Sequence, residues 1–232
     1  MPHKKTLLAT VTALITLLAA AVALAAAING TAGPDTINGT ATADTINGLG
    51  GDDTINGNGG NDRIDGGSDD DTINGDCAVG SPSPGPYGCL PGNGGKDDLR
   101  GGSGQDTISG NERNDRISGQ GGDDRLRGND GNDRISGGSG TDVISGGDGK
   151  DFITGSGGDD KLRGQKGGDK ITGGSGRDLI EGGAGNDKIR ARDGQRDRVN
   201  CGSGRDTVTA DRRDKIAKNC EKVRRGGKKN KK

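Results

Sequence analysis

The sequence is poor in the side chains from which most proteins build a core. Its 232 residues contain one Phe, one Tyr and no Trp, and only 25% of them are apolar. Glycine is abundant instead, with 50 residues. Such a composition excludes an ordinary globular core and is, taken alone, typical of a disordered chain.

Histidine is nearly absent as well, which excludes several classes of enzyme. The only histidine is His3, and it lies inside a segment that is typical of an export signal. The chain has no HExxH motif, and neither a Ser-His-Asp triad nor a Cys-His pair can form in the mature protein. We therefore expect a protein without enzymatic activity. The enzymatic alternative is a hydrolase or lyase on a β-helix scaffold, although short, nearly uniform coils would leave little room for a cleft.

What the sequence does contain is a repeat of nine residues, here called a nonad. Eleven nonads follow one another without a gap from Gly92 to Arg190, and five more run from Gly30 to Asn74. Gly is first in each nonad, Asp sixth and Ile or Leu eighth, while position 4 is Gly except at Thr42, Asp69 and Arg113. Disorder does not require an apolar residue at a fixed phase, so this repeat predicts an ordered solenoid.

Each nonad predicts a tight turn followed by a very short strand. Glycine is favoured where the backbone turns with a positive φ or approaches another backbone closely. The last three residues can form a strand whose apolar side chain points inward and whose other two side chains point outward. The turn offers backbone carbonyls and ends in a carboxylate, and several hard oxygen ligands of this kind suit Ca²⁺.

This pattern resembles the haemolysin-type calcium-binding repeat, the RTX nonapeptide. The resemblance implies an all-β fold, a parallel β-roll or β-helix solenoid of nonapeptide repeats with two nonads per coil. It also implies multiple Ca²⁺ ions, each held between the turns of successive coils by Gly carbonyls and by the aspartates at position 6. The metal ligands expected on this basis are Asp35, Asp44, Asp53, Asp62, Asp71, Asp97, Asp106, Asp115, Asp124, Asp133, Asp142, Asp151, Asp160, Asp169, Asp178, Asp187 and Asp206. Asp44 and Asp71 are the weaker candidates, because Thr42 and Asp69 replace Gly in their turns.

The energetics of one nonad predict that folding depends on the metal. Burial of one Ile or Leu returns less free energy than the ordering of nine residues costs. The carboxylates of neighbouring turns also repel one another. We therefore expect the metal-free chain to be largely unfolded and Ca²⁺ to drive its folding.

The first 27 residues are typical of an export signal. A basic start at Lys4 and Lys5 is followed by an apolar stretch from Leu7 to Leu18 and an Ala-rich end from Ala19 to Ala27. The Ala-rich end favours cleavage by a signal peptidase. The alternative is an uncleaved anchor, because the segment from residue 7 to residue 27 is uncharged and long enough to span a bilayer. We expect a secreted, extracellular protein, either free or associated with the cell surface.

The four cysteines permit three pairings, of which two local disulfides are favoured in an exported chain: Cys77 with Cys89, and Cys201 with Cys220. The first would close a Pro/Gly-rich loop, and the second would staple a cap of degenerate repeats. The expected divisions are a signal peptide at 1–27, a first β-roll block at 28–74, the disulfide loop at 75–91, a second block at 92–190, the cap at 191–223 and a basic disordered tail at 224–232.

Two functions follow from these features. The first is a secreted calcium-binding repeat protein, with calcium ions as its partners and an anionic cell-wall polymer or membrane surface as a possible partner of the basic tail. The alternative is an extracellular adhesin or surface-binding module for a wall polymer, carbohydrate or ice, in which outward columns such as Thr36, Thr54 and Thr72 would form the binding face. Nucleic acid is not expected as a partner, because the chain is predicted to be exported and lacks aromatic side chains for stacking.

Overall fold

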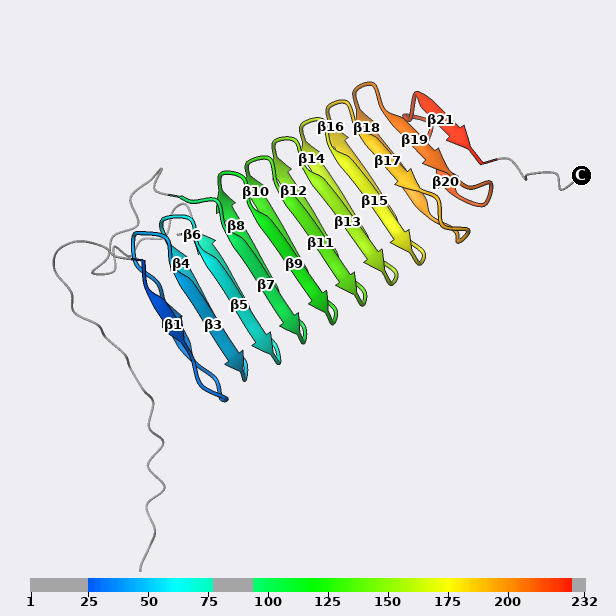
Figure 1. Ribbon diagram of the computed structural model, residues 1–232. Helices are drawn as coiled ribbons and strands as arrows, with labels where there is room; N and C mark the ends of the chain where they lie inside the picture. The colour runs from blue at the N-terminus through cyan, green and yellow to red at the C-terminus, as the bar shows by residue number, and fades with distance from the viewer. Residues whose placement is uncertain (1–24, 77–93, 227–232) are drawn as a thin grey trace, which may run out of the picture.

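A computed structural model of the chain describes residues 25–76 and 94–226. These residues form a parallel β-solenoid of about ten coils, in which two flat sheets lie face to face (Figure 1). Each nonad contributes one strand, and successive nonads contribute alternately to the two sheets. The predicted all-β roll with two nonads per coil is therefore confirmed. Within the described ranges, no helix is long and apolar enough to cross a membrane.

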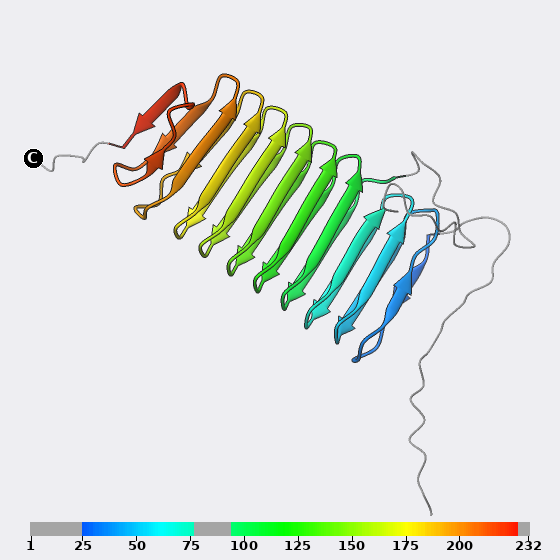
Figure 2. The ribbon, with the colours of Figure 1, turned by 180° about the vertical axis from the view of Figure 1, so that it is seen from behind.

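The two sheets are built from alternate nonads, and Figure 2 shows the same stack of coils from behind. The sheet of odd-numbered strands, called the odd sheet, contains β1 (Ala27–Asn29), β3 (Thr45–Gly50), β5 (Arg63–Ser68), β7 (Asp98–Ser103), β9 (Arg116–Gly121), β11 (Arg134–Ser139), β13 (Phe152–Gly157), β15 (Lys170–Ser175), β17 (Lys188–Ala191), β19 (Thr207–Ala210) and β21 (Lys222–Arg225). The even sheet contains β2 (Thr36–Asn38), β4 (Thr54–Asn58), β6 (Thr72–Asp76), β8 (Thr107–Glu112), β10 (Arg125–Asp130), β12 (Val143–Asp148), β14 (Lys161–Lys166), β16 (Leu179–Ala184), β18 (Arg198–Ser203) and β20 (Lys215–Ile216).

The core consists of the apolar residues at position 8, one from each strand. Parallel pairing joins residues 18 apart, so Ile135 lies between Ile117 and Ile153 in the odd sheet. The equivalent residues of both sheets stack in this way and are almost all buried. A strand with one inward residue suffices here, because the opposite sheet supplies the other half of a thin apolar layer.

Glycine at position 4 is required where one turn stacks on the next. Gly122 has a φ of +125°, and a Cβ placed on it would lie 1.6 Å from the carbonyl oxygen of Gly104 in the preceding coil. No side chain fits at that separation, so this turn can approach the preceding one so closely only because residue 122 lacks a Cβ. Asp69 and Arg113, which replace Gly at this position, also adopt a positive φ, of 77° and 73°.

The interruption of the repeat lies inside a single turn. A Cβ on Gly75 would lie 2.3 Å from Oδ2 of Asp97, which is the relation that Gly66 has to Asp71 in an uninterrupted nonad. Gly75 therefore takes the first position of the nonad that ends in β7, whereas the sequence alone counts that nonad from Gly92. Residues 77–93, which connect the two parts of this turn, lie outside the described residues, as do the predicted Cys77–Cys89 disulfide, the export signal up to residue 24 and the tail from residue 227.

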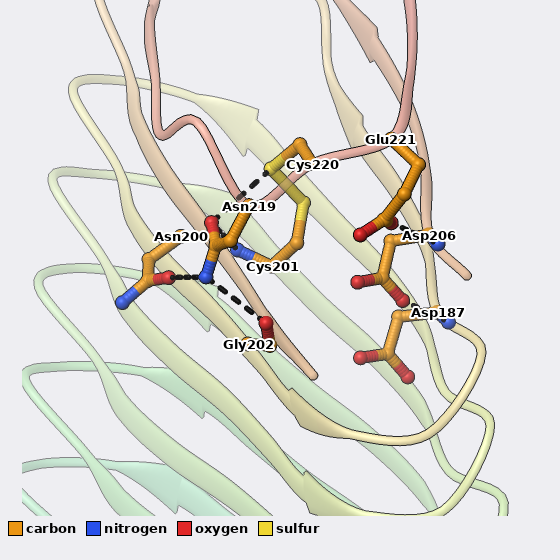
Figure 3. Close-up of a disulfide and its surroundings, with 8 residues drawn as sticks. All are labelled: Asp187, Asn200, Cys201, Gly202, Asp206, Asn219, Cys220 and Glu221. Atoms are coloured by element: carbon orange, nitrogen blue, oxygen red, sulfur yellow. Dashed lines mark hydrogen bonds between the residues drawn. A yellow bond between two sulfur atoms is a disulfide. The ribbon is translucent and has the colours of Figure 1, made fainter. Parts of the chain in front are cut away.

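The C-terminal coil is closed by a disulfide. Cys201 and Cys220 are bonded, with 5.2 Å between their Cα atoms, as Figure 3 shows. The bond fixes the segment before β21 against β18, and Cys201 itself is fully buried in the core, at the first position of its nonad. Buried Cys201 and Ala210 thus continue the core into the last coils, where the glycine-rich pattern is lost.

Candidate metal centre

The aspartates at position 6 form two columns along the inside of the solenoid. Each stands directly before a strand, and its side chain points to the same interior as the apolar residue at position 8. The odd column precedes the odd sheet and contains Asp44, Asp62, Asp97, Asp115, Asp133, Asp151, Asp169, Asp187 and Asp206. The even column contains Asp35, Asp53, Asp71, Asp106, Asp124, Asp142, Asp160, Asp178, Asp197 and Asp214.

One oxygen of each inner carboxylate is satisfied by the neighbouring coil. The backbone N–H of Asp115 donates to Oδ1 of Asp133 at 2.8 Å, and the N–H of Asp133 donates to Oδ1 of Asp151 at 2.9 Å. The same bond recurs along both columns. Charged acceptors of this kind make stronger hydrogen bonds than neutral ones, so the ladder holds successive turns in register.

The other oxygen has no hydrogen-bond partner. Seventeen buried carboxylate oxygens, all of them Oδ2 atoms, lack a partner among the described residues. Buried polar atoms are bonded in the large majority of cases, so a regular line of exceptions indicates a missing ligand. In the regular nonads, the Oδ2 lies against the first Gly of its own nonad; a Cβ on Gly137 would be 2.0 Å from Oδ2 of Asp142.

Burial strongly raises the pKa values of these carboxyl groups. Loss of hydration raises the pKa of Asp97 and Asp115 to about 8 and that of Asp62 to about 7. The hydrogen bond from the preceding backbone N–H lowers each pKa, and the nearby carboxylates raise it again. In the absence of a cation, these groups therefore hold protons close to neutral pH.

The turns offer a second set of oxygen atoms. No N–H of the described residues donates to the carbonyl oxygens of Gly122, Gly140 or Gly158, which face the position-4 glycines of the next coils. The described residues contain no cluster of three or more His, Cys, Asp or Glu side chains suited to a metal. A cation would thus be held by one or two carboxylates together with turn carbonyls, which is a ligand set that Ca²⁺ accepts. The buried, unpartnered Oδ2 atoms fit this role.

Not all of the predicted ligands share this geometry. Oδ2 of Asp35 accepts an N–H bond from Thr31 at 2.6 Å, and Oδ2 of Asp44 accepts one from Thr40 at 2.5 Å. Both Oδ2 atoms are therefore satisfied by the protein itself in the first coils. Asp71 has an unpartnered Oδ2 like the central aspartates, although its turn has Asp69 in place of Gly.

The structure adds residues that the list of predicted ligands lacks. Asp197 and Asp76 are both buried and have an unpartnered Oδ2. Asp197 stands two residues before buried Val199, and that spacing is the sequence signal for it; Asp76 is at position 2 and has no such signal. At the C-terminal end, Oε2 of Glu221 accepts the N–H of Asp206 at 2.8 Å and so replaces the next aspartate of the odd column (Figure 3).

A second ladder runs along the outside of the turns, at position 5. Asp123 Oδ1 accepts the N–H of Thr141, and Asn132 Oδ1 accepts the N–H of Lys150, both at 2.7 Å. Asp159 makes the same bond with Arg177, and that bond lowers its pKa. The frequent Asp and Asn at position 5 could have indicated this ladder, which joins successive turns without a metal.

A parallel β-solenoid whose turns carry both stacked, buried carboxylates and carbonyl oxygens without N–H donors is a calcium-binding β-roll. The family model of the RTX calcium-binding nonapeptide repeat, which holds four copies, matches residues 29–64, 48–76, 91–126, 109–144, 136–171, 163–196 and 172–208. These matches cover more than half of the chain, so the protein belongs to the RTX calcium-binding nonapeptide repeat family. No curated protein matches the chain.

Proposed function

We propose that this is a secreted protein without enzymatic activity, whose β-roll folds when Ca²⁺ binds between its turns. The observation that carries the proposal is the line of buried Oδ2 atoms without partners. Without a cation, each such carboxyl must either take up a proton or remain charged in a poorly hydrated interior, and both states disfavour the folded roll at neutral pH.

The residues that would hold the ions are the position-6 aspartates with unpartnered Oδ2 atoms, together with the carbonyls of the adjoining turns. Bound Ca²⁺ supplies the positive charge that allows these carboxylates to be ionised while buried. The chain contributes the rest: the Oδ1 ladder sets the register of the coils, and the glycines at positions 1 and 4 leave the room that the carboxylates and carbonyls require.

Secretion is supported by the apolar, Ala-rich N-terminal segment and by the Cys201–Cys220 disulfide, since disulfides persist mainly in oxidising compartments. Extracellular calcium modules bind with dissociation constants of about 10⁻⁴–10⁻³ M. A chain with such sites would stay unfolded in the cytosol and fold after export. N-terminal sequencing of protein from the culture medium tests this: a terminus near residue 28 is expected, and retention inside the cell contradicts export.

Circular dichroism tests the coupling of folding to metal. We expect a disordered far-UV spectrum in EGTA and a β-rich spectrum in millimolar Ca²⁺, with Mg²⁺ much less effective because it requires a smaller octahedral site. Identical spectra in EGTA and Ca²⁺ would show that the roll does not need the metal.

A matched pair of variants locates the ligands. Asp151→Asn removes a carboxylate whose Oδ2 lacks a partner, whereas Asp44→Asn changes one whose Oδ2 is bonded to Thr40. Isothermal titration should show fewer or weaker Ca²⁺ sites for Asp151→Asn and little change for Asp44→Asn. Equal losses in the two variants would mean that the unpartnered oxygens do not mark the sites.

A further inference from the structure

The outward side chains at position 7 of the odd sheet form a straight row of cations. Direct pairing of β9, β11, β13, β15 and β17 aligns five residues, here called the cationic row: Arg116, Arg134, Phe152, Lys170 and Lys188. These strands lie side by side in the middle of the front sheet in Figure 1. Neighbouring strands are about 4.8 Å apart, so the row extends over about 19 Å.

Most of the charge of the cationic row is not neutralised within the protein; only at one end does a carboxylate adjoin it, where Asp98 of β7 pairs in register with Arg116. None of its four cations forms an ion pair with a described residue, and the odd-sheet strands from β9 to β21 contain no Asp or Glu. On the even sheet, by contrast, Arg163 pairs with Glu181 at 2.8 Å. Like charges directly opposite one another destabilise a sheet, so an anionic ligand on this face would relieve a repulsion that the fold maintains.

Phe152 fixes the centre of the row. It is the only Phe of the chain, and its side chain is 47% exposed. The Arg134 guanidinium lies 5.5 Å from the ring centroid and the Lys170 ammonium 5.2 Å from it. These cation–π contacts hold two long side chains on either side of the ring, which reduces the entropy lost when they bind an anion.

A row of hydroxyl groups runs beside the cations on the same strands. Position 9 carries Ser118, Ser136, Thr154 and Thr172, about 7 Å from position 7. At β9 this row reaches a polar hollow of about 520 Å³, whose lining includes Asp65, Arg100, Ser118 and Gln120. The face therefore offers regularly spaced positive charges and, next to them, regularly spaced hydrogen-bonding groups.

We propose that the odd sheet binds a linear acidic glycan along the cationic row. Carboxylate or sulfate groups would contact the four cations, and the sugar hydroxyls would contact the Ser/Thr row and the hollow. Single-stranded nucleic acid fits less well, because its binding relies on several aromatic side chains for stacking and this face has one. A lipid surface would use the cations but would have no use for the ordered hydroxyl row.

The test compares two faces of the same full-length chain at a fixed, saturating Ca²⁺ concentration. The row variant carries Arg116→Gln, Arg134→Gln, Lys170→Gln and Lys188→Gln. The control carries Arg125→Gln, Arg127→Gln, Lys161→Gln and Arg198→Gln, which remove the same charge from the even sheet, where these cations also lack ion pairs. Circular dichroism and thermal melting first establish that both variants keep the folded roll.

Binding is then measured by titration calorimetry with a size-defined heparin oligosaccharide and with an oligogalacturonate, which separate sulfate from carboxylate recognition. The row variant should bind one or both at least about tenfold more weakly, and the control within about threefold of the wild type. Removal of residues 227–232 should leave the dependence on the row intact.

Four results would overturn the proposal. The wild type could bind neither glycan, the even-sheet control could lose as much affinity as the row variant, or the tail could account for the binding. The fourth result is that a single-stranded oligonucleotide or phosphatidylserine vesicles bind more tightly than the glycans and depend on the same row. The odd sheet would then bind nucleic acid or a lipid surface instead of a glycan.

Discussion

At the scale of single residues, the first Gly and the sixth Asp of a nonad act as one unit. The Oδ2 atom of the aspartate occupies the space that a Cβ of the glycine would fill, as Gly137 and Asp142 show. The glycine is therefore needed for its missing side chain, since no positive φ is involved at this position. A methyl group here would displace the carboxylate from the place where a cation can reach it.

Gly137→Ala should destabilise the calcium-loaded roll by about 1–3 kcal/mol, because its Cβ would overlap Oδ2 of Asp142 and the carbonyl oxygen of Gly155. Gly121→Ala is the matched control, since the nearest atom to its Cβ would be Ser139 Oγ at 3.5 Å. That control should stay within about 0.5 kcal/mol of the wild type. Urea unfolding in saturating Ca²⁺ measures the free energy of unfolding of both variants. Equal losses would show that the contact between the position-1 Gly and the aspartate does not require a glycine more than position 3 does.

The raised pKa values predict that acid partly replaces calcium. The folded, metal-free roll retains protons on its inner carboxyls up to a pKa of about 6 for Asp106 and about 8 for Asp97, whereas the unfolded chain releases them near 3.8. Folded carboxyls thus bind more protons, so their contribution to stability is fully present below pH 3.8 and is lost as the pH rises from there through the folded pKa values of about 6 to 8. In EGTA, circular dichroism should show more β-structure at pH 5 than at pH 8. An increase of structure with pH would contradict the burial of these groups.

At the scale of elements, the last coils are held by different bonds from the middle ones. The odd carboxylate ladder ends at Glu221 and the even one at Asp214, the repeat loses its glycines, and the Cys201–Cys220 disulfide ties the segment before β21 to β18. The central coils contain both carboxylate columns, and each of them packs against a regular coil on either side. Because stability in a solenoid is a sum of contacts between adjacent coils, a change at this end should remain local.

Replacement of both Cys201 and Cys220 by Ser should lower the free energy of unfolding of the C-terminal coils by about 3 kcal/mol, the value typical of a loop of this length. Hydrogen exchange in Ca²⁺ should show faster exchange in β18 to β21 and unchanged exchange in β9 to β15. Uniform loss of protection along the roll would instead indicate a single cooperative unit.

At the scale of the whole molecule, the interruption leaves the solenoid continuous. Asp62 donates its N–H to Oδ1 of Asp97 at 2.8 Å across 35 residues, where the regular coils use 18. The difference of 17 residues equals the length of the segment 77–93. Removal of that segment would join Asp76 to Gly94 and restore one regular nonad, with the sequence GDGGKDDLR.

A chain that lacks residues 77–93 should therefore keep the calcium-induced circular dichroism and the melting temperature of the wild type. The control lacks residues 79–95 and carries Cys77→Ser, so that the spacing is also nine but Ala78 replaces Gly95 at position 4. A Cβ on Gly95 would lie 1.4 Å from the carbonyl oxygen of Gly60, so this control should melt at a lower temperature. Equal melting temperatures would show that the turn does not need its glycine.

The sequence predicts most of this architecture because each nonad carries both signals, an apolar residue at position 8 and an aspartate at position 6. The sequence does not predict which aspartates keep a free oxygen or which surface residues align, because contacts between coils determine both. Oδ2 of Asp35 and Asp44 is satisfied by the Thr31 and Thr40 backbone only because of the local turn. Asp76 belongs to a nonad whose halves are 17 residues apart, and no local pattern can join them. The cationic row becomes visible only when residues 18 apart are placed side by side.

Because successive nonads alternate between the two sheets, the sheet to which a strand belongs depends on whether an odd or an even number of nonads precedes it. Insertion or loss of one nonad upstream would move every later strand to the opposite side of the molecule, although the inward residues would stay inward. The gain of two nonads, by contrast, would lengthen the roll and preserve each surface pattern. A genetic duplication that keeps the face with Arg134 and Lys170 intact must therefore copy an even number of nonads.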